Sequence, residues 1–208
     1  RTRFIILIPG RTGSSFLVSA LDKHPRIAVE GEQLVPLESA GEQAAWIRSV
    51  YGRRRFRVHA CGFKTKLKDV RDKDAFRAML EEFEVKVVHA SRTDPVRRAI
   101  STINARRLKE ARGVWNLRAD MPQLGPFTLD LDEMDEALRF VEETGAELEE
   151  FMRSHDLPRI VVRYEDILAD SREQLRRVQE FIGVEVRSLE SGTAKNTPDS
   201  LGQVLENH

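Results

Sequence analysis

Residues 9–15 read Pro-Gly-Arg-Thr-Gly-Ser-Ser and combine two glycines, one cation and three hydroxyl groups. A continuous apolar run at residues 4–8 precedes them, and apolar side chains recur at helical spacing across residues 16–21. This order predicts a buried strand, a tight loop and a helix. Because a helix N-terminus offers unpaired N–H groups and a partial positive charge, the loop predicts a binding site for a phosphate- or sulfate-sized anion.

Two common nucleotide-binding loops do not fit these residues. P-loop enzymes carry G-x-x-x-x-G-K-[ST], whereas Ile8 stands here at the first glycine and Ser14 at the lysine. Dinucleotide-binding folds carry G-x-G-x-x-G, which Gly10 and Gly13 alone do not supply. An ordinary strand-to-helix turn is the remaining alternative, although the cation and the position after the first strand favour an anion site.

The loop resembles the 5′-phosphosulfate loop of the sulfotransferases, which move a sulfuryl group from 3′-phosphoadenosine 5′-phosphosulfate (PAPS) to an acceptor. Residues 11–14, Arg-Thr-Gly-Ser, followed by His24-Pro25, are similar to the form typical of bacterial carbohydrate sulfotransferases. Pro9-Gly10 reverses the usual Gly-Pro order of that family. The resemblance implies that the donor is bound by Gly10, Arg11, Thr12, Gly13, Ser14 and Ser15.

The same resemblance implies a set of catalytic residues. Carbohydrate sulfotransferases place a glutamate general base shortly after His-Pro, which makes Glu32 the candidate and Glu30 its alternative. The Lys64-Thr65-Lys66 segment is similar to the K-T-H of cytosolic members, in which the lysine contacts the sulfuryl group and the histidine is the base. Lys66 replaces that histidine and acts as a base only if burial lowers its pKa far below about 10.4. The implied catalytic residues are therefore Arg11, Glu32 and Lys64.

A second anion site is expected after the strand predicted at residues 85–90. Asp94 and Pro95 are a typical N-cap and first residue of a helix. Sulfotransferases bind the 3′-phosphate of the donor here, with an arginine at the strand end and a serine on the helix, and Arg92 and Ser101 fit those roles. A guanidinium group binds a phosphate through paired hydrogen bonds.

Three later segments also resemble parts of the family. Residues 106–130 lack periodicity and include Trp115, and we interpret them as the acceptor-side loop. Residues 163–166, Arg-Tyr-Glu-Asp, are similar to a segment that pins loops by hydrogen bonds. Lys195 lies in a segment similar to the late loop over the donor nucleotide and is a further donor-binding candidate.

The elements that must position these residues alternate along the chain. Its 208 residues suffice for one α/β domain, residues 1–208, with a mainly parallel central sheet flanked by helices and a P-loop-like anion-binding first βα turn. The predicted strands are residues 4–8, 26–29, 58–63, 85–90 and 160–162. The predicted helices are residues 16–21, 40–51, 74–83, 95–105, 131–152 and 171–182.

The composition of the chain limits the classes of binding partner and the cellular compartments that we expect. Lysine plus arginine and aspartate plus glutamate each total 34, so the chain lacks the excess charge of a nonspecific polyanion binder, and we expect no nucleic-acid partner. Cys61 is the single cysteine, which fits a reducing compartment and a cytoplasmic location. No apolar run approaches the ~20 residues that span a bilayer.

These observations together predict a sulfotransferase that uses PAPS. The acceptor is expected to be a small molecule or carbohydrate, by similarity to nodulation and glycolipid sulfotransferases. No metal is needed if Arg11 and the loop N–H groups take the developing charge. The alternatives are a P-loop-like nucleotide kinase, which requires a loop lysine, and a non-catalytic nucleotide-binding module.

Overall fold

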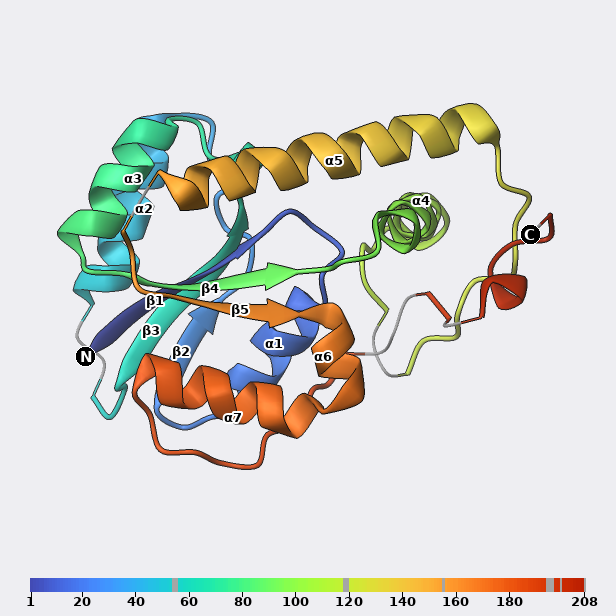
Figure 1. Ribbon diagram of the computed structural model, residues 1–208. Helices are drawn as coiled ribbons and strands as arrows, with labels where there is room; N and C mark the ends of the chain where they lie inside the picture. The colour runs from blue at the N-terminus through green and yellow to red at the C-terminus, as the bar shows by residue number, and fades with distance from the viewer. Residues whose placement is uncertain (54–55, 118–119, 155, 194–196, 199, 208) are drawn as a thin grey trace.

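The protein folds around one five-stranded sheet (Figure 1). The computed structural model describes residues 1–53, 56–117, 120–154, 156–193, 197–198 and 200–207. In these residues the strand order is β2-β3-β1-β4-β5, and every neighbouring pair is parallel. The strands are β1 (Thr2–Ile8), β2 (Ile27–Glu30), β3 (Ala60–Lys66), β4 (Lys86–Ser91) and β5 (Arg159–Arg163). The predicted α/β fold with a parallel sheet flanked by helices is confirmed.

Helices connect the strands and cover both faces of the sheet. The α-helices are α1 (Ser14–Leu21), α2 (Ala40–Gly52), α3 (Lys73–Glu82), α4 (Pro95–Arg112), α5 (Leu131–Arg153), α6 (Tyr164–Ala169) and α7 (Ser171–Ile182). Two short 3₁₀ helices are η1 (Leu67–Asp69) and η2 (Leu201–Gln203). None of the helices in the described ranges is long and apolar enough to cross a membrane.

Strand β1 lies in the middle of the sheet and is buried on both faces, as its continuous apolar run predicts. Its side chains alternate between two apolar clusters. Phe4, Ile6 and Ile8 pack with α1, α6 and α7, whereas Ile5 and Leu7 pack with α2, α3 and the second half of α5. Figure 1 shows these two helix layers below and above the sheet.

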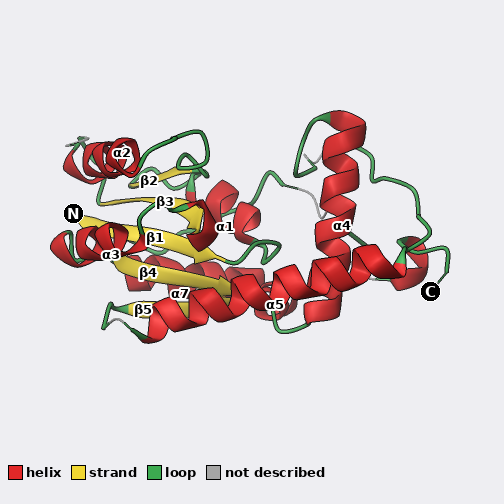
Figure 2. Ribbon diagram, turned by 90° about the horizontal axis from the view of Figure 1, so that it is seen from above, coloured by secondary structure: helices red, strands yellow, loops and turns green. Residues whose placement is uncertain are grey.

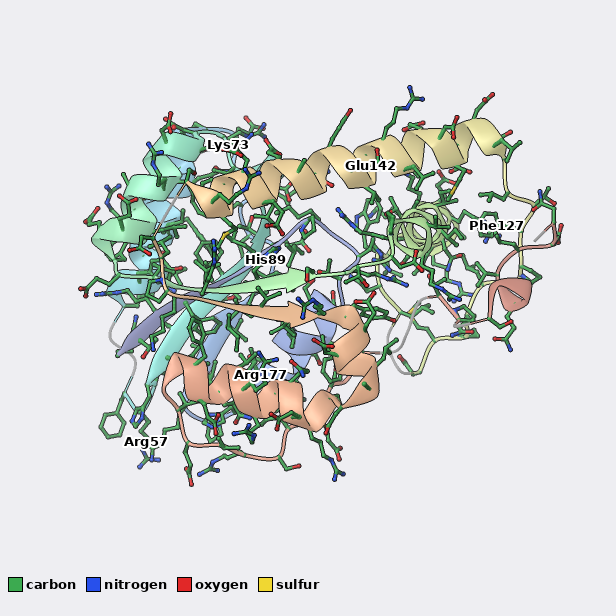
Figure 3. The ribbon with its side chains drawn as sticks, viewed as in Figure 1. Arg57, Lys73, His89, Phe127, Glu142 and Arg177 are labelled. Atoms are coloured by element: carbon green, nitrogen blue, oxygen red, sulfur yellow. The ribbon has the colours of Figure 1, made fainter. Side chains whose placement is uncertain are left out.

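A third apolar cluster lies beyond the C-terminal ends of the strands. There α4 packs on the first half of α5 and on Phe127, Val204 and Leu205. Phe127 and Leu205 form an isolated parallel bridge, which joins the chain between α4 and α5 to the C-terminal segment. Figure 2 shows α4 standing across from the strand ends, and Figure 3 labels Phe127 beside it. The loops that follow the strands therefore lie on the side of the sheet that faces α4.

The structure corrects two boundaries that the sequence predicts. Lys64, Thr65 and Lys66 belong to β3 itself, because β3 pairs with β1 as far as Ile8 opposite Lys66. The acceptor-side loop expected at residues 106–130 begins later, since α4 continues to Arg112 and ends at Gly113, whose φ of 73° is a left-handed helix cap. Buried Leu108 keeps this last part of α4 on the core.

Gly62 in β3 provides a test of the sheet packing. A Cβ atom at this position would lie 2.3 Å from the Phe4 carbonyl oxygen and 2.8 Å from the Phe4 ring, so Gly62→Ala forces the two central strands apart. We expect this variant to lose about 1–3 kcal/mol of unfolding free energy, the usual cost of overpacking. Urea unfolding measures the loss, with Gly41→Ala, at an exposed position in the first turn of α2, as the control. Equal stability of the two variants would contradict the packing described for β1 and β3.

Candidate active site

The loop between β1 and α1, residues 9–15, presents hydrogen-bond donors without protein partners, and we call it the anion loop. Gly13 precedes α1 and provides no side-chain cap. Within the described residues, the backbone N–H groups of residues 11–15 make no hydrogen bond. The hydroxyl oxygen of Thr12 is buried and also lacks a hydrogen-bond partner. Unpaired buried donors at a helix N-terminus fit an anionic ligand, as the sequence predicts.

The backbone of the anion loop is tightly wound. Gly10, Arg11 and Gly13 have φ angles of 102°, 58° and 74°. Glycine adopts such angles without steric cost, but an arginine does not, so Arg11 is held in an unfavourable conformation by its surroundings. A Cβ atom on Gly13 would lie 2.9 Å from the Tyr164 ring. Tyr164 at the start of α6 therefore packs directly against the loop.

Arg92 follows β4 and lies beside the anion loop. Its guanidinium carbon lies 4.4 Å from the centre of the Tyr164 ring, and its Nε is buried without a hydrogen-bond partner. Burial lowers the pKa of Arg92, and Tyr164, Glu165 and Asp94 partly oppose that effect. The N–H of Thr93 donates to Glu165 at 3.2 Å, so residues 164–165 hold both loops in place.

Arg11 and Ser101 meet between the anion loop and α4. The Arg11 Nε donates to the buried Ser101 Oγ at 3.2 Å, and Nη1 donates to the Asn116 Oδ1 at 3.2 Å. Burial, followed by the charge of Arg92, lowers the pKa of Arg11 to about 10. Arg11 therefore stays charged at neutral pH and lies within electrostatic range of Arg92. The structure thus brings together Arg11, Arg92 and Ser101, which the sequence predicts as separate donor-binding elements.

Glu32 follows β2 and forms ion pairs with two lysines of β3. Its carboxylate lies 2.8 Å from the Lys64 Nζ and also pairs with Lys66. Burial alone would raise the pKa of Glu32, but the two ammonium groups outweigh it and the pKa is lowered from 4.5. The Lys64 Nζ also lies 3.4 Å from the Ser15 Oγ. Lys64 therefore connects the candidate base with the anion loop.

Glu30 occupies a different place from Glu32. It is the last residue of β2, opposite Phe63, and its side chain alternates with Val29 toward the α2 face of the sheet. There it lines a cavity of about 180 Å³ together with Trp46 and Cys61. No residue of the anion loop lines this cavity.

Sequence reasoning missed two residues of the site. Arg98 donates to the carbonyl oxygens of Pro9 and Gly10 in the anion loop, and Asn116 accepts from Arg11. Arg98 lies one helical turn before Ser101, on the same face of α4, and this spacing could have indicated that Arg98 faces the site. No comparable pattern marks Asn116.

One predicted donor contact, Lys195, lies outside the described residues. The nearby Thr197 is described, and its hydroxyl lies 3.4 Å from the Ser101 Oγ. Among the described residues no group of three or more histidine, cysteine, aspartate or glutamate side chains is arranged to hold a metal ion.

Comparison with protein families adds an observation independent of this geometry. The model of the Stf0 sulphotransferases matches residues 35–200. The chain belongs to the Stf0 sulphotransferase family. The matched segment includes Lys64, Arg92 and Ser101, whereas the anion loop and Glu32 precede it. The assignment to the PAPS-dependent sulfotransferases is thereby confirmed, and the chain is a sulfuryl-transferring enzyme.

Solved structures share the fold of this sulfotransferase. A crystal structure of a sulfotransferase from Alicyclobacillus acidocaldarius has a TM-score of 0.58 and 17% identity, and the match covers 96% of this chain and 87% of that one. Mouse sulfotransferase SULT7A1 complexed with PAP has a TM-score of 0.54 and 11% identity, with 90% and 61% covered. A comparison with curated protein sequences finds no match. At these identities the structures support the fold alone.

The ion pairs of Glu32 predict a pH-dependent stability. Because its pKa in the folded sulfotransferase is below 4.5, the ionised carboxylate stabilises the fold above that pH, and the contribution is lost as the pH falls through the lowered pKa. Glu32→Gln should therefore be less stable than the wild type at neutral pH, and the difference should shrink in acid. Urea unfolding across a pH series measures it, with Glu30→Gln as the control. A difference that stays constant with pH would contradict the ion pairs.

Proposed function

We propose that this enzyme transfers the sulfuryl group of PAPS to a hydroxyl group of a carbohydrate or glycolipid, with Glu32 as the base. One observation carries the proposal. The anion loop, with its unpaired N–H groups, lies between the Arg92–Ser101 pair on one side and the Glu32–Lys64 pair on the other. A nucleotide with an anion at each end fits the anion loop and the Arg92–Ser101 pair. The Glu32–Lys64 pair fits a base with a neighbouring cation.

The donor would be held at both of its anionic ends. The N–H groups of residues 10–15 and the hydroxyls of Thr12, Ser14 and Ser15 are the proposed partners of the 5′-phosphosulfate. Arg92 and Ser101 are the proposed partners of the 3′-phosphate. The buried, unpartnered Nε of Arg92 and hydroxyl of Thr12 support this assignment, because each is a donor that a bound phosphate or sulfate oxygen would satisfy. Lys195 remains a proposed further contact.

Transfer requires a proton acceptor and a cation at the leaving oxygen. Glu32 would take the proton of the acceptor hydroxyl as its oxygen attacks sulfur, and the sulfur–oxygen bond to the 5′-phosphate would break. The negative charge then moves to the phosphate oxygen of the nucleotide, where Arg11 and Lys64 would stabilise it. Two lysines keep Glu32 ionised at neutral pH, which is the form that accepts a proton.

The acceptor is proposed from the type of base and from the adjacent chain. The residues between α4 and α5 touch Arg11 through Asn116 and the Trp115 carbonyl oxygen, which lies 3.4 Å from the Arg11 Nη1. Trp115 is an exposed residue, with 53% of its surface accessible. An exposed indole suits the apolar face of a sugar ring, and the backbone of the same residue contacts Arg11, so we propose this segment as the acceptor side.

Replacing Glu32 tests the proposed base. Glu32→Gln keeps the size of the side chain and should leave the affinity for adenosine 3′,5′-bisphosphate (PAP) unchanged. Its turnover with labelled PAPS and a carbohydrate acceptor panel should fall by about 100-fold or more, the scale of a lost general base.

The matched control is Glu30→Gln, which removes the neighbouring carboxylate that faces α2. We expect it to retain wild-type turnover. A fully active Glu32→Gln, or an inactive Glu30→Gln beside it, would remove Glu32 from the chemistry.

A further inference from the structure

Arg98 links the anion loop to the two helices beyond the sheet. Its side chain is buried in α4, with 5% of the residue exposed. Nε donates to the Gly10 carbonyl oxygen at 3.0 Å and Nη2 donates to the Pro9 carbonyl oxygen at 2.9 Å. Toward α5, Nη1 donates to the Val141 carbonyl oxygen at 3.0 Å, and Nη2 also donates to the Thr144 Oγ1 at 2.8 Å.

These bonds determine which way two peptide groups of the anion loop face. In a trans peptide the carbonyl and the N–H that share the bond point in opposite directions. Arg98 holds the carbonyls of Pro9 and Gly10 on the side of α4 and α5. The N–H groups of the same two peptides, which belong to Gly10 and Arg11, must then point the other way.

The charge of Arg98 indicates that an anion belongs nearby. Its acceptors in the described chain are three carbonyl oxygens and one hydroxyl, and none is a carboxylate. Burial, and then the charge of Arg92, lowers its pKa to about 10, so it remains charged at neutral pH. A buried cation with only neutral partners is unfavourable. A bound anion on the opposite side of the loop would compensate for it.

We propose that Arg98 is a positioning residue, which turns the N–H groups of Gly10 and Arg11 toward the 5′-phosphosulfate of the donor. The inference rests on the proposed function and deepens it. Arg98 does not touch the donor, and it acts through the peptides that do.

Helix α5 holds Arg98 in place for this role. The Thr144 hydroxyl donates to the Phe140 carbonyl oxygen at 2.7 Å, which leaves its lone pair to accept from Arg98. At Gly145 a Cβ atom would lie 3.4 Å from the Arg98 Nη1, so the glycine leaves room for the guanidinium. Helix α5 therefore supports the anion loop indirectly, through the guanidinium of Arg98.

The affinities for two nucleotides distinguish a positioning role of Arg98 from a purely structural role. PAP carries both phosphates, whereas adenosine 3′-monophosphate carries only the phosphate assigned to Arg92 and Ser101. In Arg98→Gln the affinity for PAP, measured by calorimetry, should fall by about 10- to 100-fold, the scale of lost hydrogen bonds to a charged group. The affinity for adenosine 3′-monophosphate should stay unchanged.

A second variant keeps the test valid if Arg98→Gln does not fold. Thr144→Val removes one support of the guanidinium and nothing from the loop, and its affinity for PAP should fall by about threefold or more. Thr102→Val is the matched control, because its hydroxyl contacts the backbone carbonyl of Arg98 at 2.9 Å and leaves the guanidinium untouched. It should bind both nucleotides as the wild type does.

The outcomes also separate this inference from the proposed function. If wild-type protein binds neither nucleotide, the proposed function fails and the role of Arg98 fails with it. If the wild type prefers PAP but the folded Arg98→Gln keeps the same ratio of the two affinities, only the role of Arg98 is overturned. Equal behaviour of Thr144→Val and Thr102→Val would overturn it in the same way.

Discussion

An excess of positive charge at one end of the sheet is the constraint on which the site depends. Burial, and then the charge of Arg92, lowers the pKa of both Arg11 and Arg98, and the unpaired N–H groups of residues 11–15 add the partial charge of a helix N-terminus. In the described residues Arg11 and Arg98 donate to neutral acceptors, and Arg92 lies over the Tyr164 ring with Glu165 and Asp94 nearby. Burial makes this arrangement unfavourable without a counter-charge, and a nucleotide with two anionic ends supplies one.

Lys64 relates that donor site to the proposed chemistry. Its ammonium group, on β3, lies within reach of both the Ser15 hydroxyl, which follows β1, and the Glu32 carboxylate, which follows β2. Strand β3 lies between β1 and β2 in the sheet. The parallel order of these strands places their C-terminal ends side by side, so the proposed base after β2 and the anion loop after β1 face one lysine between them. The sheet topology thus sets the separation between Glu32 and the anion loop, across which the proposed transfer would occur.

Much of this arrangement could be predicted from local signals. Apolar runs located the strands, and Asp94 before Pro95 located the start of α4, because burial and capping act on residues close in sequence. Bonds between distant residues could not be predicted in this way. Arg98 contacts Gly10 across 88 positions and Arg11 contacts Asn116 across 105. The length of α4 was also missed, because its last turn is rich in charged residues and contacts a later loop, where Arg112 donates to the Pro122 carbonyl oxygen.

The central claim is that one nucleotide occupies two anion sites on the wild-type enzyme, and calorimetric titration tests it most directly. PAP, AMP and adenosine 3′-monophosphate are titrated separately, together with ATP in the presence of magnesium. The account predicts that PAP binds at least about 10-fold more tightly than either monophosphate, since each lacks one charged end. It also predicts that PAP binds more tightly than magnesium ATP. AMP binding as tightly as PAP, or tighter binding of magnesium ATP, would contradict it.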